Sequence, residues 1–265
     1  MYLDWAGQKI EVREIGAGGS TILVHGYPLD GAMWSGVARA LAPTLRVLKL
    51  DLPGHGENAA PAAESVEGHA DFVEALLEQL PGPVGLAGFS MGGYVALALM
   101  KRRPEKVRAL ALVDTRAGAD DEAGRVKRNE AIATVREGGV TPIAQAMLPK
   151  LLSPEGLKKA DLVERTSRIM TRQKPDTVVA DLAALRDRPD QTATLPSIAV
   201  PTLVVVGELD ILTPPSESQA ISAAIPGARL VVVPGAGHLA PMERPRAVAA
   251  ALGDFFANSL ASPGL

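Results

Sequence analysis

A serine at position 90 lies in a setting that can make it a nucleophile. The segment 88–92 reads Gly-Phe-Ser-Met-Gly, which fits the pattern G-x-S-x-G, between the apolar run Val84–Phe89 and a helical pattern. A sharp turn there lifts the Ser90 hydroxyl above a sheet, and small residues two positions either side let strand and helix approach closely. The backbone N–H of Met91 would lie unpaired at a helix N-terminus, where a negative charge is favoured. We predict that Ser90 is the nucleophile and that the Met91 amide stabilises the oxyanion.

A serine hydroxyl needs a base to act as a nucleophile at neutral pH. The chain has four histidines: His25, His55, His69 and His238. His238 follows the turn residues Gly235 and Gly237 in a loop just after the apolar run Arg229–Val233, at the sheet edge where Ser90 is expected. His69 is expected at the solvated start of a helix. His238 is therefore the predicted base.

The base needs a carboxylate that orients its ring and stabilises the imidazolium. Asp210 follows the apolar run Thr202–Gly207 at the same predicted edge, and Glu208 lies two residues before it. Asp114, at the end of another apolar run, remains an alternative. We predict that Asp210 is the acid.

The tetrahedral intermediate of acyl transfer needs a second aligned donor. His25-Gly26-Tyr27-Pro28 follows the first buried strand pattern, and Gly26 permits a close backbone approach. We predict that the Tyr27 amide completes the oxyanion hole and that its ring contacts substrate. Trp34 and Met147 are further candidates for the substrate pocket, with core packing as the alternative.

Six short apolar runs, rich in Val and Leu, predict strands that are buried on both faces. The runs are Thr21–His25, Leu45–Asp51, Val84–Phe89, Val107–Asp114, Thr202–Gly207 and Arg229–Val233. Helical patterns such as His69–Leu80 and Met91–Arg103 separate them. The predicted fold class is therefore α/β, with a mostly parallel, doubly wound sheet. The residues on either side of Ala6–Gly7 are expected to form an antiparallel hairpin on the sheet edge.

Residues 116–192 interrupt this alternation with a charge-rich stretch that reads as wholly helical. We predict a core of residues 1–115 and 193–265 and an inserted helical cap of residues 116–192. The cap would lie over the carboxyl ends of the strands, where ligands bind in open α/β sheets. A helical subdomain with no part in the pocket is the alternative.

Prolines and charges suggest details of this cap. Thr141–Pro142 and Ser153–Pro154 each place a hydroxyl before a proline, which is typical of a helix start. Pro149 is expected to end the intervening helix. The cap could place Arg125 or Arg128 over an anionic substrate, or leave both on its solvated face.

Composition excludes several classes of function. The 265 residues include no Cys, 27 basic and 30 acidic residues. Disulfides, a thiolate nucleophile and Cys-based metal sites are therefore excluded, and the scattered histidines predict no metal site. The balanced charge gives no reason to expect nucleic acid or a membrane surface as a partner. Neither a membrane-spanning run nor a signal peptide is visible, so we expect a cytoplasmic protein.

Five motifs together resemble the α/β-hydrolase fold superfamily of the lid-bearing esterase or lactonase type. They are HGYP (His25–Pro28), DLPGHG (Asp51–Gly56), GFSMGG (Gly88–Gly93), GELD (Gly207–Asp210) and GAGHLAPMERP (Gly235–Pro245). Residues 112–132 look like the branch that contains 3-oxoadipate enol-lactonases and carboxylesterases. The resemblance implies a triad in the chain order Ser90, Asp210, His238. It also implies a structural role for His55.

The expected reaction is hydrolysis of a small carboxylic ester or lactone through an acyl-enzyme, without a cofactor. Two alternatives stay open: a cofactor-free perhydrolase or haloperoxidase on the same triad, and a ligand receptor of the same fold with negligible turnover. The serine at position 90 speaks against dehalogenase relatives, whose nucleophile is an aspartate. Neither the particular ester nor the oligomeric state follows from the sequence.

Overall fold

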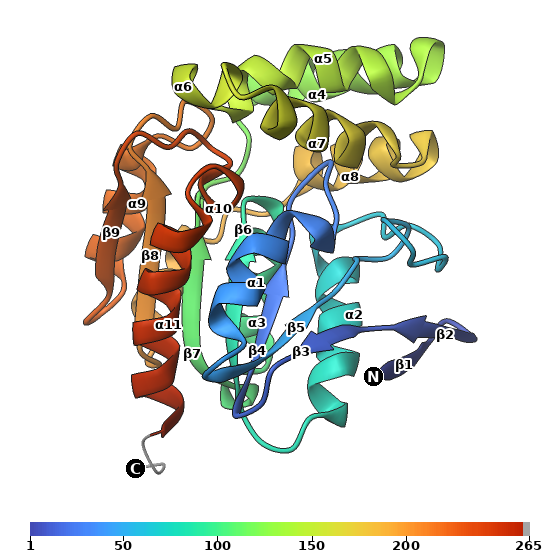
Figure 1. The fold of residues 1–265 in the computed structure, drawn as a ribbon. Helices are drawn as coiled ribbons and strands as arrows, with labels where there is room; N and C mark the ends of the chain where they lie inside the picture. The colour runs from blue at the N-terminus through green and yellow to red at the C-terminus, as the bar shows by residue number, and fades with distance from the viewer. Residues whose placement is uncertain (262–265) are drawn as a thin grey trace.

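A seven-stranded sheet forms the centre of the computed structural model, which describes residues 1–261 (Figure 1). Its strand order is β3-β5-β4-β6-β7-β8-β9. The strands are β3 (Arg13–Ile15), β4 (Gly19–Val24), β5 (Leu45–Lys49), β6 (Val84–Phe89), β7 (Val107–Val113), β8 (Thr202–Gly207) and β9 (Arg229–Val233). All neighbours pair in parallel except β3, which is antiparallel to β5. The predicted α/β class, with a mostly parallel and doubly wound sheet, is confirmed.

Helices cover both faces of this sheet, which explains why its central strands are apolar along their whole length. Every residue of β6 and β8 is buried. Figure 1 shows α1 and α11 on the near face and α2, α3 and α9 behind it. These helices are α1 (Ser35–Leu41), α2 (Val66–Gln79), α3 (Met91–Arg102), α9 (Pro215–Ala224) and α11 (Pro245–Ala261). Burial on both sides removes the polar alternation that a half-exposed strand would show.

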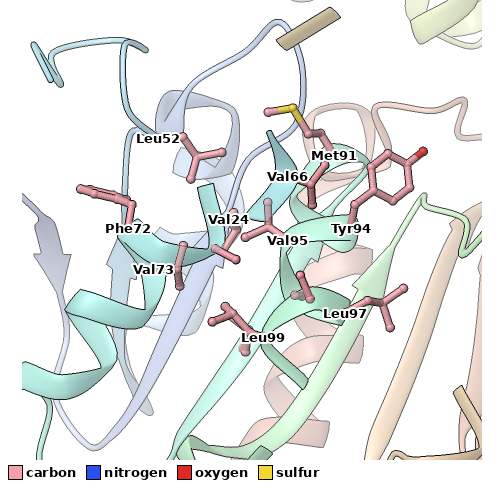
Figure 2. Packing of buried hydrophobic residues seen from close by; sticks show 14 of the residues in the cluster. Val24, Leu52, Val66, Phe72, Val73, Met91, Tyr94, Val95, Leu97 and Leu99 are labelled. Carbon is pink, nitrogen blue, oxygen red and sulfur yellow. The ribbon is translucent and has the colours of Figure 1, made fainter. Parts of the chain in front are cut away.

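Helix α3 lies between the sheet and α2, and residues 91–100 are all buried. Figure 2 shows Val95 and Leu99 of α3 among apolar side chains of α2 and the sheet, such as Val73 and Val24. Close packing of this kind holds a helix rigidly. The first residue of α3, which follows Ser90, is therefore held in a fixed position.

The N-terminal hairpin differs from the expectation. Strands β1 (Tyr2–Trp5) and β2 (Gln8–Glu11) pair with each other as a separate two-stranded sheet, and only β3 joins the large sheet. Leu3 and Ile10 are buried, and Trp5 packs edge-on against Phe72 of α2 at 5.6 Å between ring centroids. The β1–β2 hairpin buries its apolar face on α2 instead of extending the sheet, so the predicted place at the sheet edge was wrong for these two strands and is confirmed only for β3.

Five helices lie between β7 and β8, within the predicted cap, and form a layer at one end of the sheet (Figure 1). We call them the cap helices: α4 (Glu122–Gly138), α5 (Val140–Leu151), α6 (Pro154–Leu157), α7 (Ala160–Thr171) and α8 (Pro175–Asp187). The hydroxyl of Ser153 caps α6 as predicted, accepting from the Gly156 amide at 3.0 Å. Thr141 does not cap α5, because that helix already begins at Val140. Pro149 does not end α5 either, because it lies in the last turn and the helix runs on to Leu151.

The remaining short elements join these layers. They are the 3-10 turns η1 (Gly31–Trp34), η2 (Pro104–Lys106) and η3 (Thr192–Ser197) and the helix α10 (Ala240–Glu243). Among residues 1–261, no helix is both long and apolar enough to cross a membrane.

Candidate active site

Ser90 occupies a sharp turn between β6 and α3. Its backbone φ of +51° lies in the left-handed region, which is strained for a residue with a side chain. A Cβ atom on Gly88 would lie 2.2 Å from the backbone oxygen of Gly92, so glycine is required for strand and helix to approach this closely. The Ser90 amide donates to the Val113 carbonyl at 3.0 Å. The neighbouring strand β7 therefore helps to hold the turn in place.

Three loops bring the predicted serine, histidine and aspartate together. His238 Nε2 lies 3.0 Å from Ser90 Oγ, and its Nδ1 lies 2.8 Å from Asp210 Oδ2. His238 and Asp210 are almost fully buried, whereas Ser90 is partly exposed. A base that is held by a carboxylate and faces a hydroxyl is the arrangement needed to activate a serine.

Thr213 belongs to this constellation, although the sequence reasoning did not single it out. Its hydroxyl donates to Asp210 Oδ2 at 2.6 Å, and the amides of Leu212 and Thr213 donate to Oδ1 at 2.8 and 3.0 Å. Burial alone would raise the pKa of Asp210, but His238 and these donors hold it below its ordinary value. Asp210 is therefore ionised at neutral pH. The spacing of three residues between Asp210 and Thr213, which suits an aspartate that caps its own turn, is the signal that could have found Thr213.

Asp114, the alternative acid, lies near Asp210 but contacts a different group. Its Oδ1 accepts from the Gly207 amide at 2.7 Å, and its buried Oδ2 has no partner among the described residues. Burial and the nearby charge of Asp210 raise the pKa of Asp114 well above its ordinary value. Asp114 therefore holds the end of β8 and does not bond to His238.

The segments that carry the predicted oxyanion donors lie beside Ser90. Met91 begins α3, so its N–H precedes the first bond within that helix. A Cβ atom on Gly26 would lie 2.9 Å from the Phe89 oxygen and from Ser90 Cβ, which brings the backbone before Tyr27 against the serine. The roles of the Tyr27 and Met91 amides remain predictions.

A cavity of about 620 Å³ opens above Ser90 and His238. Of the predicted substrate-contacting residues, Tyr27 and Met147 line it. Trp34 is not among its lining residues. That side chain is fully buried in the core between the sheet and α1, where it packs edge-on against Phe89 at 6.2 Å between ring centroids.

Basic residues of the cap differ in their relation to this cavity. Arg128 lines it and pairs with Asp120 at 2.9 Å, whereas Arg125 is exposed and lies outside it. Arg116 also lines the cavity and was missed by the sequence reasoning. Its place just after β7, at the edge where the strands end, is the signal that could have found it.

A comparison with models of known protein families identifies the family to which this chain belongs. Residues 21–251, most of its length, match the model of the alpha/beta hydrolase family. The chain belongs to the alpha/beta hydrolase family. This match spans the Ser90, Asp210 and His238 segments together with the cap helices.

Similar alpha/beta hydrolases include esterases and a lactonase. A pimeloyl-acyl carrier protein methyl ester esterase of Nitrosomonas europaea is 28% identical over 238 residues, which cover 87% of this chain and 92% of that protein. The structure of a thermophilic esterase from Thermogutta terrifontis, with malate bound, superposes with a TM-score of 0.93 at 33% identity over 98% of this chain and 99% of that one. The enol-lactonase of Burkholderia xenovorans LB400 superposes with a TM-score of 0.88 at 26% identity, over 96% of this chain and 99% of that one. These likenesses support the predicted esterase or lactonase type of alpha/beta hydrolase.

The other three histidines of this alpha/beta hydrolase form a second, buried group. Asp181 of α8 accepts from His55 at 2.7 Å and contacts His69 at 3.1 Å, and all three side chains are fully buried. The ring of His25 packs against that of His55 at 4.8 Å. The expectation that His69 is solvated was therefore wrong: the position at the start of α2 is covered by the cap helix α8.

The pKa values of the side chains in this histidine group are shifted in different directions. Burial alone would lower the pKa of His55, but the Asp181 carboxylate raises it above its ordinary value. Burial would raise the pKa of Asp181, yet His55 and His69 hold it well below its usual range. Burial and the nearby His55 lower the pKa of His25 to about 3. His25 is therefore neutral, and its Nε2 accepts from the Leu52 amide at 2.9 Å.

Proposed function

We propose that this protein is a serine esterase that hydrolyses a small carboxylic ester or lactone through an acyl-enzyme. The observation that carries the proposal is the unbroken chain of hydrogen bonds from Ser90 through His238 to Asp210 at the wall of a cavity. The esterases and the enol-lactonase that resemble this chain support the same class of reaction.

The first half of the reaction forms the acyl-enzyme. Ser90 Oγ attacks the carbonyl carbon of the ester while His238 Nε2 takes the hydroxyl proton. The negative charge that develops on the carbonyl oxygen is stabilised by the amides of Met91 and Tyr27. The intermediate then collapses: the bond to the leaving oxygen breaks, and the leaving alkoxide takes the proton from His238. With a lactone, the alcohol stays tethered to the acyl group.

The second half releases the acid. A water molecule gives its proton to His238 Nε2 and its oxygen attacks the acyl carbon. Collapse of this second intermediate breaks the bond to Ser90 Oγ, and the proton returns from His238 to the serine. Asp210 stays ionised throughout, because its role is to orient the ring and to stabilise the imidazolium.

Replacing the nucleophile tests this proposal. Ser90→Ala is expected to lower kcat for p-nitrophenyl acetate by roughly 10⁴- to 10⁶-fold, because no other hydroxyl faces His238 Nε2 among the described residues. A fluorophosphonate should label the unmodified protein, and peptide mapping should locate the adduct at Ser90. Ser218→Ala is the matched control, because Ser218 is a buried serine on α9 whose hydroxyl has no partner among residues 1–261. Turnover that survives Ser90→Ala would reject the proposal.

The same preparation separates the two alternatives. Labelling without repeated turnover across a panel of esters and lactones would favour a ligand receptor. Peracid formation from a carboxylic acid and hydrogen peroxide, at a rate above that of ester hydrolysis, would favour a perhydrolase. The esterase proposal expects multiple turnovers and faster hydrolysis.

A further inference from the structure

Arg116 lies at the wall of the cavity between the two strands that carry the proposed nucleophile and acid. It is three residues beyond the end of β7, and β7 lies between β6, which leads to Ser90, and β8, which leads to Asp210. Ser90, His238 and Arg116 all line the same cavity. A guanidinium is thus placed beside the site at which the ester would react.

The charge of Arg116 is not compensated within the described part of the protein. Its Nη2 donates to the Leu212 carbonyl at 2.6 Å, and its Nε is buried without an acceptor. No carboxylate of residues 1–261 forms an ion pair with it. By contrast, Arg128 and Arg188 both pair with Asp120, at 2.9 and 2.8 Å. Buried charges are normally paired, so a half-buried guanidinium at the cavity wall without an ion-pair partner is suited to bind an anionic group from outside the chain.

Two lysines extend this positive wall toward solvent. Lys127 of α4 and Lys150 of α5 line the cavity, are exposed, and form no ion pair within residues 1–261. The acidic members of the wall are Asp120, which its two arginines neutralise, and Asp121, which caps α4 by accepting from the Gly124 amide at 2.7 Å. The cavity therefore carries a net positive charge, which attracts an anionic ligand.

We propose that the substrate carries a carboxylate besides its ester or lactone group, and that Arg116 binds this carboxylate while the ester carbonyl lies at Ser90. The inference rests on the proposed esterase function and adds a substrate class to it. Arginine suits this task because its planar fork pairs with a carboxylate through two parallel hydrogen bonds. Hydrogen bonds to a charged group are stronger than those between neutral groups, so the carboxylate should improve both binding and orientation.

The test compares substrates that differ in charge but hardly in shape. Monomethyl esters of straight-chain dicarboxylic acids, from succinic to suberic acid, are assayed against the corresponding methyl ester monoamides. In the unmodified protein at low salt, kcat/KM should be at least tenfold higher for the carboxylate member than for the amide member at one or more chain lengths. Arg116→Gln should bring this ratio close to one, and Arg116→Lys should leave an intermediate ratio because it keeps the charge but loses the fork. Arg125→Gln is the control, because it removes one positive charge from α4 outside the cavity and should leave the ratio unchanged.

The outcomes separate the two proposals. Ser90-dependent hydrolysis with no preference for the carboxylate member at any length would overturn the anion site and leave the esterase proposal intact. A ratio that survives Arg116→Gln, or that falls equally in Arg125→Gln, would also overturn the assignment to Arg116. Failure of the unmodified protein to hydrolyse any ester, including p-nitrophenyl acetate, would overturn both.

Discussion

At the scale of single residues, two buried aspartates at neighbouring strand ends have pKa values shifted in opposite directions. Asp210 accepts four hydrogen bonds, counting His238, and its pKa is lowered. Asp114 accepts one, from Gly207, and its pKa is raised by burial and by Asp210. The charge of Asp210, which has more donors, disfavours ionisation of Asp114.

Asparagine substitutions at these two positions should therefore have unequal effects. Asp210→Asn is expected to lower kcat by roughly 10⁴-fold, because the amide cannot stabilise the imidazolium or hold the required tautomer. Asp114→Asn should change kcat by less than about tenfold: a protonated carboxyl resembles an amide, the Gly207 amide keeps its acceptor, and asparagine tolerates the φ of +45° found there. Steady-state kinetics of both variants measures the two changes in kcat. If Asp114→Asn caused the larger loss, the acid would be misassigned.

The site residues that were predicted and those that were missed differ in how clearly their neighbours in the sequence mark them. Ser90 is marked by neighbours within two positions on each side, and Asp210 and His238 each follow a strand whose apolar run is easily seen. Trp34 lacks such a signal. Arg116 is marked only by its place after β7, which does not tell whether its side chain points into the cavity. Core and pocket positions share the same residue types, so spacing cannot separate them.

At the scale of elements, the loop that carries His238 depends on the cap helices. The Leu239 amide donates to the Leu151 carbonyl at 2.9 Å. The buried Glu243 accepts from the Gly237 amide at 2.7 Å and from both the amide and the hydroxyl of Ser153. One carboxylate thus joins the turn between α5 and α6 to the residue next to His238.

Removing the charge of Glu243 should disturb both stability and activity. In Glu243→Gln, a remaining Oε1 can still accept from the Gly237 and Ser153 amides, but an NH₂ group in place of Oε2 faces the Ser153 N–H and cannot accept from the Ser153 hydroxyl. We expect the free energy of unfolding to fall by about 1–3 kcal/mol and kcat to fall with it. Urea denaturation and ester kinetics provide the measurements.

Glu208→Gln provides the matched comparison for this change. Glu208 also accepts an amide of this loop, from Gly235 at 2.8 Å, but its side chain is exposed. Water can replace the lost acceptor there, so the free energy of unfolding should change by less than about 0.5 kcal/mol. Equal effects of the two variants would show that Glu243 has no special part in holding the loop.

Strands were predicted better than the contacts of peripheral elements. The runs that became β6 and β8 have the predicted bounds, because continuous burial leaves a continuous apolar pattern. The run that became β9 also has the predicted bounds, but this edge strand is only partly buried, so its expected burial on both faces was wrong. The hairpin β1–β2 was found, but its packing on α2 was not, since local pairing does not specify the surface that covers it. His69 was misplaced for a similar reason: its partner Asp181 lies 112 residues further along the chain.

At the scale of the whole molecule, Asp181 is a link between the cap helices and the core. It projects from α8 to His55, which follows β5, and to His69 of α2. Breaking a buried ion pair by removing one partner typically costs about 3–5 kcal/mol. This carboxylate should therefore contribute to the attachment of the cap helices to the core, together with the contacts of Glu243 described above.

Asp181→Asn is expected to lower the free energy of unfolding by about 3 kcal/mol near pH 6. Asp181, with its lowered pKa, stabilises the fold above the unfolded value of about 3.9, and this contribution is lost as the pH falls through the folded value. His55, with its raised pKa, stabilises the fold below about 6.5, and its contribution is lost as the pH rises through the folded value. The difference between the unmodified protein and Asp181→Asn should be largest between about pH 4 and 6.5 and should shrink toward pH 9.

Urea denaturation across this pH range measures the effect. Asp187→Asn is the control, because Asp187 lies on the same helix, is exposed and pairs with Arg186. Its substitution should cost less than about 1 kcal/mol. A difference for Asp181→Asn that stays flat from pH 5 to 9 would contradict the proposed charge on His55.

The anchoring of the His238 loop on residues 151 and 153 has a consequence for recombination between relatives. Exchanging α4–α8 for the corresponding helices of another member would replace most of the cavity wall and, in the same step, two supports of the loop beside it. The exchange would then change the substrate preference and the position of the His238 imidazole at the same time. A functional chimera should accordingly take positions 151–153 and 237–243 from the same parent, wherever its other crossovers fall.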